Sequence, residues 1–129
     1  MSSNFAKLWF VLAACTFMLG SAPTTREAKD FDPKLSYRLV KAGAILIDTR
    51  SPEEYRIRHV SGAVNIPFDR ISQNQKLLRD LTKDSRKKPI VVYCRSGRRS
   101  AIAKTRLLKM GYLYVVNHGS LDAWLDKNP

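Results

Sequence analysis

A single cysteine ends the β-branched segment IVVYC (residues 90–94), and the basic segment RSGRRS (residues 95–100) follows it directly. The nucleophilic form of cysteine is the thiolate, and neighbouring cations or backbone N–H groups lower the pKa of a thiol. A compact glycine-containing loop that leads into a helix turns successive N–H groups inward and also attracts anions. The spacing therefore predicts a nucleophilic Cys94 within an anion-binding loop, in preference to an inert buried cysteine.

Strands and helices alternate along the chain around this loop. The patterning predicts strands at 44–48, 90–94 and 112–117, an extended segment at 62–67, and helices at 33–42, 52–58, 69–82, 101–110 and 121–127. This alternation predicts an α/β fold, a small doubly wound domain with a mainly parallel sheet and helices on both faces. Ligands of such folds bind beyond the carboxyl ends of the strands, where Cys94, Asp48 and Arg50 all lie in the sequence.

Local signals mark the helix ends. Asp32, Ser51 and Ser120 are expected to be N-caps, and Glu54 completes a capping box with Ser51. The helix expected at 69–82 is amphipathic, and its apolar side is predicted to hold Ile71, Leu77, Leu78 and Leu81.

Two segments resemble the signature of rhodanese-type sulfurtransferases. LIDTRSPEEYRIRHVSGAVNIP (residues 46–67) is similar to that family's D-x-R, E-[FY] and H-[IV]-x-G-A-x-N-[IV]-P pattern, and VVYCRSGRRSAIAKTRLLKMGY (residues 91–112) is similar to its strand, loop and helix. The resemblance covers about residues 31–127 and points to the single-domain, exported type of the family. The sequence departs from the pattern at Ser120, where a second glycine is usual, and at Arg58, where the family has glycine.

The resemblance implies a sulfurtransferase that moves a sulfane sulfur from thiosulfate or a similar anionic donor to cyanide or a thiol acceptor. Cys94 would carry the sulfur as a persulfide, and Asp48 and Arg50 would support the loop as an ion pair, while His59 would be structural. No cofactor, metal or nucleic acid is implied, and a monomer is expected. The substrate-binding residues would be Arg95, Ser96, Gly97, Arg98, Arg99 and Ser100.

Two other functions remain open from the sequence. Related phosphatases and arsenate reductases use a longer C-x5-R loop, whereas Arg99 here closes a six-residue loop that begins at Cys94. A rhodanese-like fold can also act as a binding module, and the formal charge of +12 would suit an acidic partner or a membrane surface.

The amino-terminal segment has the composition of an export signal. Lys7 precedes the apolar run LWFVLAACTFML, which is short for a membrane span. Residues 1–22 are therefore predicted to be a removed signal, a lipoprotein signal cut before Cys15, or an uncleaved anchor. Residues 23–30 would be a linker and 31–129 the rhodanese-like domain, and all three alternatives place the domain in the periplasm of a Gram-negative cell.

Overall fold

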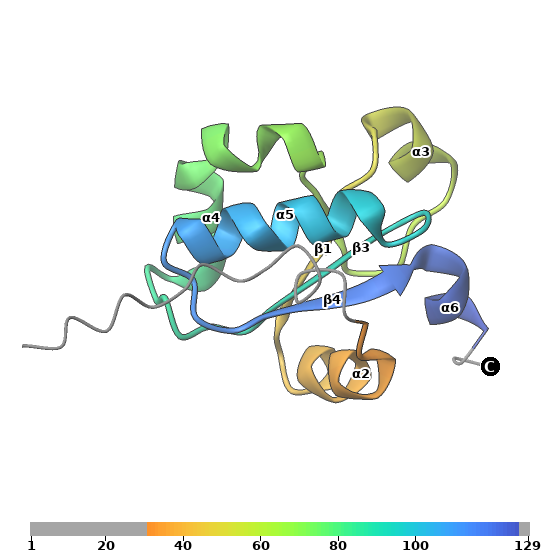
Figure 1. The fold of residues 1–129 in the computed structure, drawn as a ribbon, viewed down its shortest axis with the longest axis horizontal. Helices are drawn as coiled ribbons and strands as arrows, with labels where there is room; N and C mark the ends of the chain where they lie inside the picture. The colour runs from red at the N-terminus through yellow and green to blue at the C-terminus, as the bar shows by residue number, and fades with distance from the viewer. Residues whose placement is uncertain (1–30, 127–129) are drawn as a thin grey trace, which may run out of the picture.

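A four-stranded, all-parallel sheet forms the centre of the protein, as a computed structural model of residues 31–126 shows (Figure 1). The strand order is β2-β1-β3-β4, and the central pair β1 and β3 aligns Ile47 with Val92. The strands are β1 (Ile45–Asp48), β2 (Val64–Asn65), β3 (Ile90–Cys94) and β4 (Val115–Ser120). The expected signal segment with Cys15 and the expected linker both lie outside the described residues.

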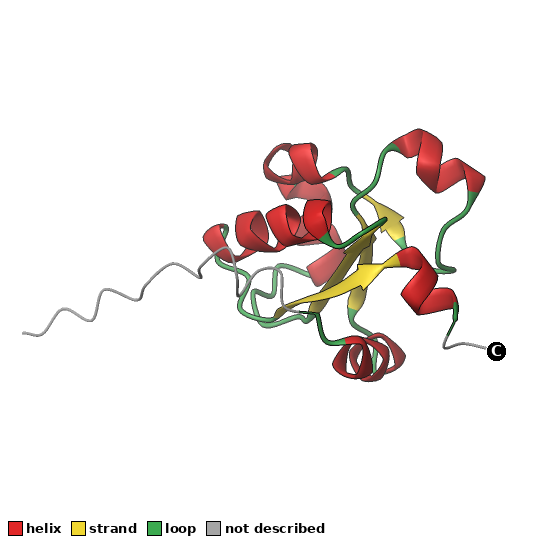
Figure 2. Cartoon of the chain, turned by 45° about the vertical axis from the view of Figure 1, so that its right-hand side comes forward, coloured by secondary structure: helices red, strands yellow, loops and turns green. Residues whose placement is uncertain are grey.

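Helices cover both faces of the sheet (Figure 2). On one face, Ile71 and Leu78 pack with Leu107 against the strands, and on the other Leu121 and Trp124 pack against Leu46, Val91 and Tyr93. This arrangement confirms the predicted doubly wound α/β class. The helices are α2 (Pro33–Lys41), α3 (Pro52–Ile57), the 3-10 helix η1 (Phe68–Gln73), α4 (Gln75–Thr82), α5 (Arg98–Lys109) and α6 (Leu121–Leu125).

The predicted caps are present. Asp32 accepts a hydrogen bond from the Leu35 N–H at 2.9 Å, and Ser120 accepts one from the Ala123 N–H at 3.1 Å. Ser51 and Glu54 form the reciprocal capping box. Within residues 31–126, no helix has the length and apolar character needed to cross a bilayer.

The helix predicted over 69–82 is divided in the structure. The η1 turn ends at Gln73 and α4 begins at Gln75, because Asn74 leaves the helical path and donates its side-chain amide to the Arg70 carbonyl at 2.8 Å. The break changes the helical phase. Ile71 and Leu78 are fully buried, as predicted, whereas Leu77 is 37% exposed and the prediction for it was wrong.

Element boundaries also differ from the prediction, by up to three residues in the last strand and in α5. The last strand begins at Val115 instead of residue 112, because Leu113 donates its N–H to the Arg86 carbonyl in a turn that precedes the ladder. Helix α5 begins at Arg98 instead of residue 101. The positive φ of Gly97 turns the chain into the helix at once, so the segment 95–100 consists of a three-residue loop and the first helical turn.

Candidate active site

Cys94 is the last residue of β3, and its side chain is fully buried under the loop that follows. The Gly97 N–H donates to Sγ at 3.0 Å, and the Ser100 hydroxyl donates to the same sulfur at 3.4 Å. Because α5 starts at Arg98, its first turn brings Ser100 back over the strand end. The loop therefore surrounds a single sulfur atom with donors.

Gly97 holds the loop in a conformation that other residues would strain. Its φ is +90°, and a Cβ built on it would lie 2.2 Å from Cζ of Phe31. The carbonyl of Gly97 accepts a hydrogen bond from the buried Asn117 side chain at 3.2 Å, and the Oδ1 of Asn117 accepts the Gly119 N–H at 3.0 Å. Phe31 and Asn117 thus fix the loop against β4.

The surroundings of Cys94 favour its ionised form. Burial by itself raises the pKa of the thiol, but hydrogen bonds from the Ser100 side chain and from the backbone N–H groups of Ser100, Ser96 and Gly97 outweigh it. The resulting pKa of Cys94 lies below that of an ordinary cysteine. The sequence predicted a depressed pKa from N–H groups, a helix terminus and guanidinium groups, and the direct contacts come from N–H groups and one hydroxyl.

Ser100→Ala should raise the pKa of Cys94, because it removes the hydroxyl that makes the largest stabilising contribution to the thiolate. Since the thiolate reacts and the thiol does not, the rate of thiol alkylation by iodoacetamide should fall at lower pH and follow that pKa. The inflection of this rate against pH should move upward in Ser100→Ala. An unchanged inflection would show that the backbone N–H groups alone set the pKa. Thr105→Ala, which changes a hydroxyl further along α5, is the matched control.

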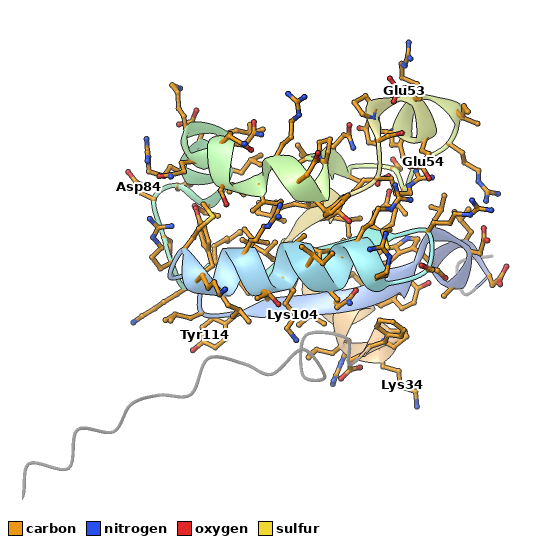
Figure 3. The ribbon with its side chains drawn as sticks, turned by 45° about the horizontal axis from the view of Figure 1, so that its top comes forward. Lys34, Glu53, Glu54, Asp84, Lys104 and Tyr114 are labelled. Carbon is orange, nitrogen blue, oxygen red and sulfur yellow. The ribbon has the colours of Figure 1, made fainter. Side chains whose placement is uncertain are left out.

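Arg99 binds Glu54 of α3. Its two terminal nitrogens donate to the two carboxylate oxygens at 2.6 and 2.8 Å. The Arg99 guanidinium, with a smaller contribution from Ser51, lowers the pKa of Glu54 to about 2. The sequence assigned Arg99 to closing the loop and binding a substrate, which stays a prediction, and the structure adds that Arg99 fastens the start of α5 to α3. Figure 3 shows Glu53 and Glu54 on α3.

Asp48 and Arg50 form the predicted ion pair at the end of β1. Arg50 Nη2 lies 2.7 Å from Asp48 Oδ2, and both side chains are buried. The Tyr93 hydroxyl also donates to Asp48 at 2.7 Å and accepts the Val60 N–H at 3.1 Å. This network ties β1, β3 and the segment before β2 together at the carboxyl end of the sheet, where Tyr93 directly precedes Cys94.

Arg95 and Arg98 have exposed side chains, and Ser96 is exposed between Arg95 and Gly97. A cleft of about 300 Å³ opens beside Arg95, and Cys94 does not line it. The exposed pair of Arg58 and Asp122, 2.7 Å apart, lies at this cleft. Its lining residues are Arg50, Glu54, Ile57, Arg58, Arg95, Leu121 and Asp122.

His59 lies outside the sulfur environment, and the structural role that the resemblance implied stays a prediction. Its Nδ1 is 2.8 Å from the Tyr55 carbonyl, and its ring stacks on Tyr55 with the centroids 3.8 Å apart. Between residues 31 and 126 no group of three or more His, Cys, Asp or Glu side chains is arranged to hold a metal ion.

Three residues of the site were not assigned to it from the sequence. Asn117 and Tyr93 carried no signal beyond their strand pattern, because their roles depend on pairing with distant residues. Glu54 was identified only as part of the capping box, and its second partner, Arg99, lies 45 positions away.

Comparison with known proteins identifies the family. The sequence matches the family described as Rhodanese-like domain over residues 32–127. The chain belongs to the rhodanese-like family. Its rhodanese-like domain is 41% identical over 75 residues to Thiosulfate sulfurtransferase PspE of Escherichia coli (strain K12), which covers 58% of this chain and 68% of that protein. It is 32% identical over 120 residues to Putative thiosulfate sulfurtransferase, mitochondrial, of Schizosaccharomyces pombe, with 83% and 84% covered.

Solved structures of the rhodanese-like family share this fold. A structure described as rhodanese with anions from E. coli superposes with a TM-score of 0.56 at 36% identity, covering 63% of this chain and 91% of that one. The human single-domain sulfurtransferase TSTD1 gives a TM-score of 0.62 at 27% identity, covering 75% and 94%. The resemblance inferred from residues 46–67 and 91–112 is therefore confirmed, and with it a rhodanese-like sulfurtransferase family.

Proposed function

We propose that the protein is a sulfurtransferase that takes the outer sulfur of thiosulfate, or of a similar anionic donor, onto Cys94. The observation that carries the proposal is the ring of donors around Sγ, with the Gly97 N–H at 3.0 Å and the Ser100 hydroxyl at 3.4 Å. Two relatives named thiosulfate sulfurtransferase support the choice of donor.

The reaction would proceed in two nucleophilic steps. The Cys94 thiolate attacks the outer sulfur of thiosulfate, the sulfur–sulfur bond of the donor breaks, and sulfite leaves with the bonding electron pair. Cyanide or a thiolate then attacks the outer sulfur of the Cys94 persulfide, and the Cys94 thiolate leaves. No proton acceptor is required in the first step when the thiolate attacks, and the hydrogen bonds that lower the pKa of Cys94 favour that form. The loop N–H groups stabilise the anionic persulfide between the steps.

Burial of the sulfur favours sulfur transfer over phosphoryl transfer. Cys94 is fully buried, and its donors converge on one atom, so a narrow terminal sulfur fits beside Sγ better than a tetrahedral phosphate does. The helix that starts at Arg98 leaves only a short loop around the thiolate.

Mass spectrometry of the full chain tests this function. The Cys15→Ser variant keeps Cys94 as its sole thiol, and thiosulfate should add one sulfur, about 32 Da, to it while cyanide should remove that sulfur. Adding Cys94→Ser should abolish the adduct. A native protein that binds thiosulfate without acquiring the adduct would be a binding module, and turnover of an aryl phosphate without sulfur transfer would make it a phosphatase.

The loop arginines should differ in their kinetic effects. Arg95→Ala and Arg98→Ala remove exposed cations that attract a dianion before the transition state, so each should raise the thiosulfate KM by about threefold to tenfold and leave kcat within twofold. Added salt should reduce this contribution, because exposed charges are screened over about 8 Å at physiological ionic strength.

Arg99→Ala should lower kcat by about tenfold or more, because it releases α5 from Glu54 and loosens the donors around the sulfur. Glu54→Gln, which keeps the size of the side chain but removes its charge, should reproduce part of this kcat loss. Steady-state assays of the four variants in one buffer make the comparison. A KM effect alone at Arg99 would show that its pairing with Glu54 does not position the loop.

A further inference from the structure

Cations are concentrated at the amino-terminal end of the parallel strands, opposite the reactive loop. The loops that precede β1, β3 and β4 meet there, since Ile45 donates its N–H to the Pro89 carbonyl and Leu113 donates its N–H to the Arg86 carbonyl, both at 3.0 Å. Figure 3 shows Asp84 and Tyr114 at this end of the molecule, away from Glu53 and Glu54. We call this surface the basic edge, and its cations are Lys41, Lys83, Arg86, Lys87, Lys88 and Lys109.

The charge of the basic edge is not neutralised by neighbouring carboxylates. Among the described residues, none of its six cations forms an ion pair, and the one carboxylate of the segment 83–89, Asp84, lies 4.0 Å from Arg79. Around the reactive loop, Arg50, Arg58 and Arg99 each pair with a carboxylate, while Arg95 and Arg98 are exposed without an ion pair among the described residues. The larger group of cations without a carboxylate partner therefore lies at the edge away from the chemistry.

Two large apolar side chains project from the same edge. Leu113 is 57% exposed and Tyr114 is 54% exposed, in the turn that leads into β4. Beside them runs a groove of about 470 Å³, which is lined by Lys87 together with apolar residues that include Leu35 and Leu39. Adjacent exposed leucine and tyrosine side chains, with Lys87 in the same groove, match the chemistry of a bilayer surface, where cations meet anionic headgroups and an aromatic ring lies at the headgroup level.

A structural role in the fold explains only some of the cations of the basic edge, and it does not explain its exposed apolar side chains. Lys41 and Lys109 lie in the last turns of α2 and α5, where a cation complements the helix dipole. Lys87 and Lys88 lie in a turn outside any helix, and the exposure of Leu113 and Tyr114 costs free energy in water.

We propose that the basic edge docks on an anionic lipid bilayer, with Leu113 and Tyr114 entering the headgroup layer. In this orientation the loop around Cys94 faces away from the bilayer, toward dissolved donors and acceptors. This docking is independent of the sulfur chemistry, and it differs from attachment through residues 1–22 because the folded domain itself makes the contact.

Vesicle binding by the full chain tests the proposal. Lys87→Gln/Lys88→Gln should weaken sedimentation with vesicles of phosphatidylcholine and phosphatidylglycerol by about 25-fold, since each cation near such a surface contributes about fivefold. Leu113→Ser/Tyr114→Ser should weaken it by about tenfold through lost apolar burial. The matched control, Lys34→Gln/Arg56→Gln, loses the same charge from exposed positions on other elements and should change binding by less than about twofold.

Hydrogen–deuterium exchange on the vesicles locates the contact even if residues 1–22 also hold the chain there. Residues 83–89 and 111–114 should become protected on anionic vesicles and not on pure phosphatidylcholine, while residues 95–100 stay unprotected. Absence of that protection, or an equal loss of binding in the control variant, would overturn the proposal. Protection of the same residues by an acidic protein but not by the vesicles would also overturn it.

Discussion

Cys94→Ser should lower the turnover of thiosulfate by about 10⁴-fold or more, the scale seen when an enzyme loses its nucleophile. A hydroxyl stays protonated where this thiol ionises, so the serine oxygen cannot form the covalent intermediate. The serine hydroxyl can still accept the Gly97 N–H that donates to the sulfur, and the loop should therefore keep its shape. Steady-state kinetics with cyanide as acceptor measure the loss.

The sequence supplies a matched control for this variant. Cys15 is the other cysteine of the chain, and Cys15→Ser in the full chain should leave kcat unchanged. Urea denaturation should give similar midpoints for the native chain and both variants, which separates loss of chemistry from loss of fold. Residual turnover in Cys94→Ser above about 1% of the native value would contradict the assignment of Cys94 as the nucleophile.

Asp48→Ala should lower the free energy of unfolding by about 3–5 kcal/mol, the effect of removing one member of a buried ion pair. The substitution leaves the Arg50 guanidinium buried without its carboxylate and removes the acceptor of the Tyr93 hydroxyl. Because Tyr93 of this network directly precedes Cys94, sulfur transfer should also fall. Chemical denaturation monitored by tryptophan fluorescence measures the change.

Two further variants test whether burial of the Asp48–Arg50 ion pair causes this loss of stability. Arg58→Gln breaks an exposed ion pair, with side chains 59% and 72% exposed, and should cost less than about 1 kcal/mol. Asp48→Ala/Arg50→Met removes both buried charges and should recover much of the stability lost in Asp48→Ala. If Asp48→Ala costs no more than Arg58→Gln, the buried pair does not stabilise the fold.

Features that depend only on residues close together in the sequence could be predicted from it. Asp32 and Ser51 cap their helices because a capping side chain reaches an N–H only two or three residues away. The apolar runs of β1 and β3 predicted buried parallel strands, and alternation with helices then put Cys94 and Asp48 at the carboxyl edge of one sheet. The thiol and its loop were recognisable because the reactive atom and its donors lie within seven consecutive residues.

Contacts between distant residues were decided only by the tertiary structure. Glu54 meets Arg99 and Asp48 meets Tyr93 across 45 positions, and Asn117 meets Gly97 across 20. These pairs follow from the strand order β2-β1-β3-β4, which brings α3 and β4 to the loop and which local patterning does not encode. The role of Arg99 shows the consequence. The sequence predicted a role for its cation in the loop, and the fold adds the carboxylate of Glu54, which the guanidinium binds through two hydrogen bonds.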